Sequence, residues 1–131
     1  LHTNDSVSGI SRLLDMGIEP FLISSSVRAF QAQRLVRTLC PHCKVPAQYD
    51  DAFLRDIGFP LTERSGLSKP VGCRQCRNSG FLGRLAIMEI CAMTPPLAEM
   101  INARATVADL KVQALKDGMM PMRHYGWIKA A

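Results

Sequence analysis

Two short stretches, Cys40-Pro41-His42-Cys43 and Cys73-Arg74-Gln75-Cys76, decide the fold that this sequence predicts. In each, a tight turn can bring both thiolates to one metal ion, and the second turn completes a tetrahedron of sulfurs. The 29 residues between them contain six glycines and prolines and could not form a large core unaided. Structural zinc contributes on the order of 10 kcal/mol in small peptides, enough to offset the chain entropy lost on closing this loop. The sequence therefore predicts a structural zinc site.

Two other uses of these cysteines are weaker hypotheses. Two disulfides would need an oxidising compartment, and nothing in the sequence indicates one. Cys-Pro-His-Cys is also the active-site dithiol of strongly oxidising thioredoxin-fold proteins, where it stands at a helix N-terminus. Pro46 would break such a helix soon after Cys43. The fifth cysteine, Cys91, lies between Ile90 and Ala92 and is expected to be a core thiol.

Composition indicates a globular part of a longer protein. The 131 residues are 47% hydrophobic and 21% charged, enough for one domain-sized core or a half-domain with appendages. No apolar run approaches the roughly 20 residues that span a bilayer, and no secretory signal opens the chain. Leu1 in place of methionine predicts that the true N-terminus is missing. The net charge of +5 is too mild to require an anionic partner.

Residues 1–91 predict two helices and two strands outside the segment between the cysteine pairs. Asp5 or Ser6 can cap a helix that ends at Gly17. Pro20 suits the first turn of a second helix, whose apolar residues continue to Phe30 and predict burial between layers. Residues 33–39 and 84–91 are expected to be strands, the latter apolar on both faces and therefore interior to a sheet. Glu89 inside that strand needs a partner.

The last third predicts three helices. Thr94-Pro95-Pro96 caps and opens one helix, and Thr106 with Asp109 forms a capping box for the next, which stops at Gly118. Pro121 opens the last helix. Trp127 is expected to pack on these helices or on a part outside the chain.

Several motifs together resemble one known family. They are Leu1-His2-Thr3-Asn4-Asp5, the stretch from Arg12 to Leu22, Gln33-Arg34-Leu35-Val36-Arg37, Leu39 with the first cysteine pair, and Gly83-Arg84 with Glu89. In this order they resemble the C-terminal part of the type II secretion and type IV pilus assembly ATPases, the GspE/PilB family. The resemblance is densest over residues 1–43 and 73–90 and looser through the linker and the tail.

The resemblance implies an α/β fold: the C-terminal half of a RecA-like P-loop ATPase domain with a four-cysteine zinc insertion and a helical C-terminal subdomain. Residues 1–39 would belong to the ATPase core, 40–80 to the zinc-binding subdomain, and 81–131 to the last core strand and the helical subdomain. In that family a cytoplasmic homo-hexamer hydrolyses ATP with magnesium. It drives secretion or pilus assembly through platform proteins of the inner membrane, and no nucleic acid is expected as a partner.

The resemblance also implies roles for single residues. His2 would sense the γ-phosphate or organise the catalytic water, and Arg84 would lie on the adenine side of the nucleotide or merely end a turn. Arg34 and Arg37 would face the nucleotide or a neighbouring subunit, with a structural salt bridge to Glu89 as the other interpretation.

Phosphoryl transfer also needs a P-loop, GxxxxGK[ST], and an acidic ligand for magnesium. The 131 residues contain no Gly-Lys-Ser or Gly-Lys-Thr, so the fragment alone is predicted to be inactive, although the resemblance implies that its parent is an ATPase. The alternative is a free-standing zinc ribbon that binds nucleic acid. Such proteins interleave aromatic with basic residues, whereas few aromatic residues, such as Tyr49 and Phe53, lie between the knuckles.

Overall fold

The computed structural model describes residues 3–131 as a mixed α/β chain that divides into two compact units. Unit 1 comprises Leu1–Gln33 and Met88–Met122, and unit 2 comprises Arg34–Ile87 and Arg123–Ala131. None of the helices described for residues 3–131 has the length and hydropathy needed to cross a lipid bilayer.

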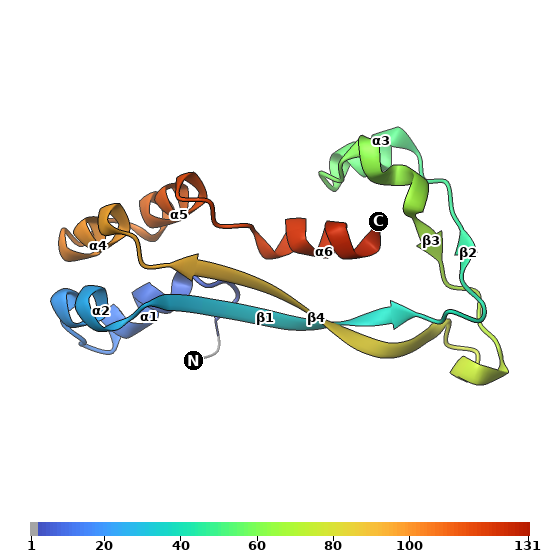
Figure 1. Ribbon diagram of the computed structural model, residues 1–131, viewed down its shortest axis with the longest axis horizontal. Helices are drawn as coiled ribbons and strands as arrows, with labels where there is room; N and C mark the ends of the chain where they lie inside the picture. Colours follow the sequence, from blue (N-terminus) through green and yellow to red (C-terminus); the bar gives the residue numbers. More distant parts are fainter. Residues whose placement is uncertain (1–2) are drawn as a thin grey trace. The chain divides into compact units, whose positions relative to one another are not determined.

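Two long strands pass through both units. Strand β1 (Ala29–Leu39) pairs with β4 (Phe81–Ala92), and Figure 1 shows their arrows pointing in opposite directions. Both predicted strands are therefore confirmed, with earlier starts than the sequence suggested. The interior position predicted for the second strand is wrong for the described residues, since this sheet has two strands and Leu82 and Ile90 are 46% and 49% exposed. An apolar pattern reports the tendency to be covered but does not identify what covers the strand.

Helix α1 (Ser8–Asp15) begins and ends where the sequence predicts. The N–H of Ser8, its first residue, donates to the Asp5 carboxylate at 2.8 Å, whereas Val7 occupies the N-cap position itself. Gly17 follows the helix with φ of 83°, a conformation that favours glycine and ends the helix.

Helix α2 (Pro20–Ser26) begins at the predicted proline but is shorter than expected. It ends before Val27, and Phe30 already belongs to β1. The burial predicted around the helix is also wrong: Ile23 is buried, whereas Phe21 and Leu22 are 68% and 53% exposed. The helix packs one face against helices α1 and α4 (Pro95–Asn102), so only that face is covered.

The three C-terminal helices confirm their predicted start signals. Thr94 caps α4 by accepting the N–H of Leu97, and Thr106 caps α5 (Val107–Lys116) by accepting the N–H of Asp109. Helix α6 (Met122–Ala130) begins directly after Pro121. Short polar caps and prolines act within one turn, which is why the sequence locates these boundaries.

The core of unit 1 is a single apolar cluster. Its buried members come from α1, α2, α4, α5, the end of β4 and the segments beside them: Val7, Ile10, Ile23, Cys91, Leu97, Ile101, Leu110, Ala114 and Met119. Cys91 is 1% exposed, which confirms it as a core thiol. Burial raises the pKa of its thiol to about 11, assisted by the charges of Glu89 and Asp117.

Unit 2 contains a short helix that the sequence did not indicate. Helix α3 (Asp51–Asp56) is followed by a 3₁₀ helix, η1 (Leu61–Gly66). Strands β2 (Val45–Pro46) and β3 (Ser68–Lys69) flank them as an antiparallel pair, with Val45 opposite Lys69. Leu54 and Phe59 are buried. The Trp127 ring of α6 meets the Phe59 ring edge-on at 6.2 Å between centroids, so Trp127 packs on the segment between the cysteine pairs.

Candidate metal centre

The first cysteine pair lies in a tight turn directly after β1. The carbonyl of Cys40 accepts hydrogen bonds from the N–H groups of Cys43 at 3.3 Å and Lys44 at 2.9 Å. These bonds fold the backbone so that both thiols lie on one side of the turn. The chain then continues into β2.

The second pair lies in a turn of different construction. Cys73 is extended, the 3₁₀ helix η2 (Arg74–Cys76) follows, and Arg77 and Asn78 are both left-handed with φ of 52° and 61°. The N–H of Asn78 closes this turn on the Cys73 carbonyl at 2.8 Å. The N–H of Cys40 donates to the Gly80 carbonyl at 2.9 Å, which joins the second turn to the first.

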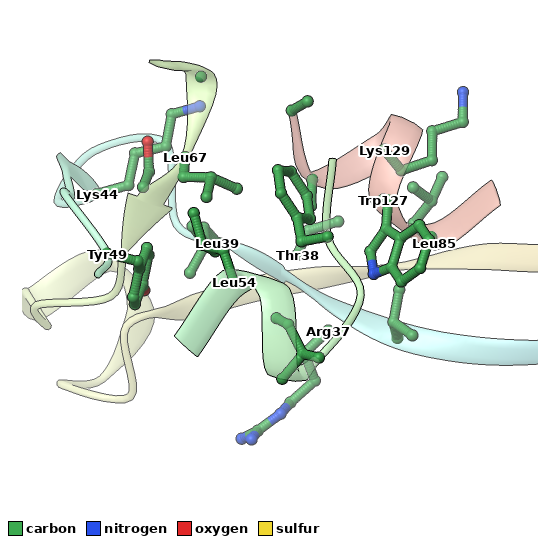
Figure 2. A pocket seen from close by; sticks show the side chains of 18 of the residues that line it. Arg37, Thr38, Leu39, Lys44, Tyr49, Leu54, Leu67, Leu85, Trp127 and Lys129 are labelled. Carbon is green, nitrogen blue, oxygen red and sulfur yellow. The ribbon is translucent and has the colours of Figure 1, made fainter. Parts of the chain in front are cut away.

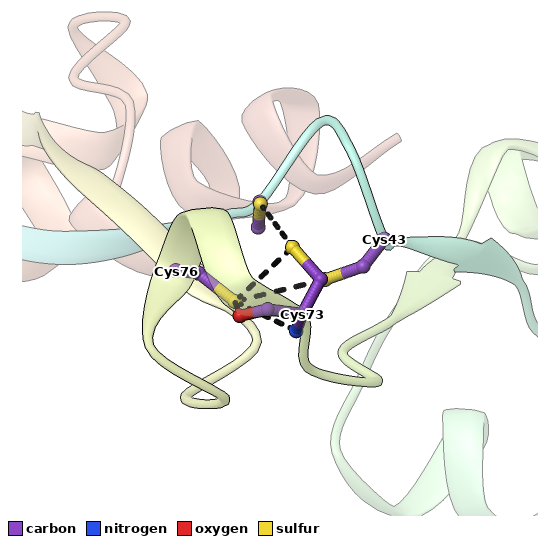
Figure 3. Close-up of side chains that lie close together, drawn as sticks. Cys43, Cys73 and Cys76 are labelled. Atoms are coloured by element: carbon purple, nitrogen blue, oxygen red, sulfur yellow. Dashed lines mark hydrogen bonds between the residues drawn. The ribbon is translucent and has the colours of Figure 1, made fainter.

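Together the two turns bring the four predicted sulfurs to one place (Figure 3). The Sγ atoms of Cys40, Cys43, Cys73 and Cys76 all lie within 4.8 Å of one another. The Sγ separations are 3.9 Å for Cys40 and Cys73, 3.8 Å for Cys43 and Cys76, and 3.7 Å for Cys73 and Cys76. A tetrahedral ion with metal–sulfur bonds of about 2.3 Å would space its ligands by about 3.8 Å. The residues therefore fit a four-thiolate metal ion.

Backbone donors surround these sulfurs. The N–H of Gly72 lies 3.3 Å from the Cys43 sulfur, and the Cys76 sulfur accepts the N–H groups of Cys73 at 3.2 Å and Gly80 at 3.3 Å. Such donors stabilise thiolates, the form in which cysteine binds a metal.

The thiol pKa values reflect this arrangement. Burial by itself would raise the pKa of Cys76, but the N–H groups of Cys73 and Gly80 lower it to about 6. Cys40 is fully buried, and burial raises its pKa to about 11 against the opposing effect of the His42 N–H. The two thiols are thus shifted in opposite directions, because N–H donors favour the thiolate of Cys76 and burial favours the protonated thiol of Cys40.

The weaker uses of the cysteines find no support in these contacts. All five cysteines are free, so the two disulfides are absent from the structure. The chain after Cys43 enters β2, and no helix begins there to stabilise a redox-active thiolate.

The residues that the resemblance assigned to the nucleotide are His2, Arg34 and Arg84. His2 falls outside the described residues. Arg34 lies on β1 and Arg84 on β4, both are exposed, and neither is a member of the four-cysteine cluster. The guanidinium of Arg37 lies 4.2 Å above the centre of the Phe81 ring, a cation–π contact within unit 2.

Glu89 has the partner that its buried position requires. Its Oε1 accepts the N–H of Ser6 at 3.0 Å and the Ser6 hydroxyl at 2.7 Å, and its Oε2 accepts the N–H of Met122 at 3.0 Å. Each carboxylate oxygen thus accepts hydrogen bonds from neutral donors. The sequence signal for this cluster was an acidic residue in an apolar strand, but nothing in it pointed to Ser6 or Met122.

Unit 2 also contains an open cavity of about 630 Å³ (Figure 2). Apolar side chains from β1, β4, α3 and α6 line it, including Leu39, Leu54, Leu85 and Trp127, and Figure 2 shows them gathered around the same space. Lys44 and Lys129 stand at its edge. The cavity lacks the sulfur ligands, so it is distinct from the metal centre.

Comparison with known proteins shows the family of the chain. A family model described as "Type II/IV secretion system protein" matches residues 1–131. The chain belongs to this family. Among its relatives, the type IV pilus assembly ATPase PilB of Myxococcus xanthus is 44% identical over 129 residues, which cover 96% of this chain and 23% of that protein. The type II secretion system ATPase E of Vibrio cholerae is 45% identical over 105 residues, 80% of this chain and 21% of that protein.

Other members of the type II/IV secretion family align over nearly the whole chain as well. The PilB protein of Thermus thermophilus is 39% identical over 132 residues, 99% of this chain and 15% of that protein. The chain thus spans about a quarter or less of the curated relatives it matches. Both pilus and secretion proteins are among them, which confirms the resemblance drawn from the sequence motifs.

Proposed function

We propose that this chain is the C-terminal part of a hexameric motor ATPase that powers type II secretion or type IV pilus assembly and carries a structural zinc ion. The observation that supports the motor most strongly is the family match over all 131 residues, with relatives named as ATPases of both systems. The four-cysteine cluster supports the metal. The nucleic-acid-binding zinc ribbon has no comparable support.

In the parent protein the described elements would form the second half of a RecA-like ATPase domain. Residues 1–39 would belong to its core, residues 40–80 to the zinc-binding subdomain, and residues 81–131 to the last strand and the helical subdomain. The parent would act in the cytoplasm and reach the inner membrane through platform proteins.

The nucleotide site of the parent would draw one residue from the start of this chain. His2 would sense the γ-phosphate of ATP bound with magnesium, and Arg84 and Arg34 would contact the nucleotide from the sheet. Backbone N–H groups of a P-loop cradle phosphates, and no GK[ST] sequence occurs among these 131 residues. We therefore expect the isolated chain to hydrolyse no ATP. Measurable turnover by the purified chain that a His2→Ala change abolishes would contradict this.

Zinc would be held by Cys40, Cys43, Cys73 and Cys76, which offer the set of four thiolates typical of structural sites. Such an ion supplies binding free energy to the fold and no chemistry of its own. The backbone around it has a defined role, because Gly72, Cys73 and Gly80 donate N–H groups to the sulfurs, which keeps the ligands oriented and ionised.

Metal analysis tests the zinc assignment. The purified chain should contain about one zinc ion per molecule by elemental analysis, because four cysteines are a typical ligand set of structural zinc. Tetrahedral sulfur sites also hold iron, so the analysis measures both metals. Cys40→Ser should lower the zinc content severely, whereas Cys91→Ser, a matched change of a cysteine buried in the other unit, should leave it unchanged. Iron in place of zinc, or equal metal content in both variants, would show the assignment to be wrong.

A further inference from the structure

A buried hydrogen-bond cluster in unit 1 connects three distant parts of the chain. The Glu89 carboxylate of β4 is 4% exposed and accepts three hydrogen bonds, two from Ser6 and one from the N–H of Met122. Ser6 is 2% exposed, and its hydroxyl also lies 3.5 Å from the Met119 sulfur. A carboxylate is costly to bury, and an apolar residue of similar size would suit an apolar strand better for stability alone.

The hydrogen bonds of the cluster hold the segment that contains Ser6 in one position. One oxygen, Oε1, binds both the backbone N–H and the hydroxyl of the same residue, which fixes its position and its orientation. The carboxylate of the neighbouring Asp5 accepts the N–H of Ser8 at the start of α1 and lies 3.9 Å from the ammonium group of Lys111 on α5. Contacts with β4, α1 and α5 therefore all hold residues 5 and 6 in place.

This segment lies close in the sequence to the residue assigned to the γ-phosphate, since Ser6 stands four positions after His2. We propose that Glu89 is a positioning residue for the nucleotide site, which holds the segment after His2 through Ser6. The inference rests on the proposed motor function. The other oxygen, Oε2, holds the first residue of α6, Met122, which is also the last residue of unit 1. The same carboxylate thus anchors the segment after His2 and the start of the helix that leads into unit 2.

The test uses the full-length protein that carries these residues, with Glu89→Gln as the main variant. The amide replaces one acceptor oxygen with a donor, so it loses at least one of the three bonds while keeping its shape. We expect kcat for ATP hydrolysis to fall about tenfold or more, because displacement of a group near the reacting phosphate by about 1 Å can cost about 100-fold. The KM for ATP should change little, since the missing interaction does not bind ATP. Hydrogen exchange should accelerate in residues 3–7 and at Met122.

Two further variants separate positioning from folding. Ser6→Ala removes the contacts of the hydroxyl with Glu89 and Met119 but keeps the bond of the backbone N–H to Glu89. It should give a smaller fall in kcat, which remains measurable if Glu89→Gln fails to fold. Ile101→Val loosens the same core without touching the cluster and should leave both kcat and exchange in residues 3–7 near wild type. Unchanged exchange in residues 3–7 in Ser6→Ala and Glu89→Gln, or a loss of kcat equal to that of Ile101→Val, would overturn the proposal.

The His2→Ala variant separates a failure of the role proposed for His2 from a failure of the positioning role of Glu89. If His2→Ala leaves kcat intact, the role proposed for His2 fails, and the positioning role of Glu89 fails with it. If His2→Ala abolishes turnover while Glu89→Gln and Ser6→Ala do not alter kcat, the positioning inference alone is wrong.

Discussion

At the scale of the residue, Gly80 shows how one backbone position supports the metal centre. Its φ is +76°, and an added Cβ would lie 2.5 Å from the Cβ of Pro70. Its N–H donates to the Cys76 sulfur and its carbonyl accepts from Cys40, so a shift here would disturb both turns. Gly80→Ala should therefore lower zinc content and thermal stability together. In Gly118→Ala, at φ of +95° with nothing within 4 Å, only the backbone cost of about 1–2 kcal/mol should appear, with zinc retained. Equal zinc content in the two variants would contradict the role of Gly80.

Asp5 gives a pH-dependent prediction at the same scale. Partial burial alone would raise its pKa, but hydrogen bonds from Ser8 and the charge of Lys111 hold the pKa below the ordinary 3.8. A carboxylate with a lower pKa in the folded state stabilises the protein above its unfolded pKa, and this contribution is lost as the pH falls through the folded value. Asp5→Ala should cost about 1 kcal/mol at neutral pH. The difference from wild type should shrink below about pH 4, measured by urea unfolding. A difference independent of pH would rule out the carboxylate as its source.

At the scale of the element, the sequence predicts what short-range signals control. Caps and prolines act within one turn, and they placed the starts of α2, α4, α5 and α6. The end of α2 was misplaced because Val27 and Phe30 continue its apolar pattern although they belong to the approach to β1 and to β1 itself. Helix α3 was missed because only six residues form it among breakers, and its stability comes from contacts such as the burial of Leu54.

The contact between α6 and the segment after α3 offers a test at this scale. The rings of Phe59 and Trp127 meet edge-on at 6.2 Å, and Gly58 faces the same indole. A double-mutant cycle with Phe59→Ala and Trp127→Ala should give a coupling of about 0.5–1.5 kcal/mol by urea unfolding. Ile128→Ala, a change of an exposed side chain on the same helix, should show no such coupling with Phe59→Ala. Additive effects of Phe59→Ala and Trp127→Ala would mean that this ring contact does not hold α6.

At the scale of the whole molecule, the two kinds of site differ in how far sequence reasoning reaches. Four identical ligands in two spaced pairs define a metal centre before any fold is known, and the structure brings those four sulfurs together. The Glu89 cluster joins residues 83 positions apart through a serine and a backbone N–H, groups that carry no spacing signal. Only the pairing of elements in space reveals it.

The division of the core and the cysteine cluster between the two units predicts which part loses structure first when the metal is removed. The apolar cluster of nine buried residues lies entirely in unit 1, whereas all four sulfurs lie in unit 2, whose β2–β3 pair and α3 are short. Chelation should therefore accelerate hydrogen exchange in residues 40–80 first, while the amides of α4 and α5 remain protected, because the metal supplies much of the folding free energy of unit 2. Added zinc should restore protection in residues 40–80. Simultaneous loss of protection in both units, or full protection of residues 40–80 without metal, would show that the ion does not have this local structural role.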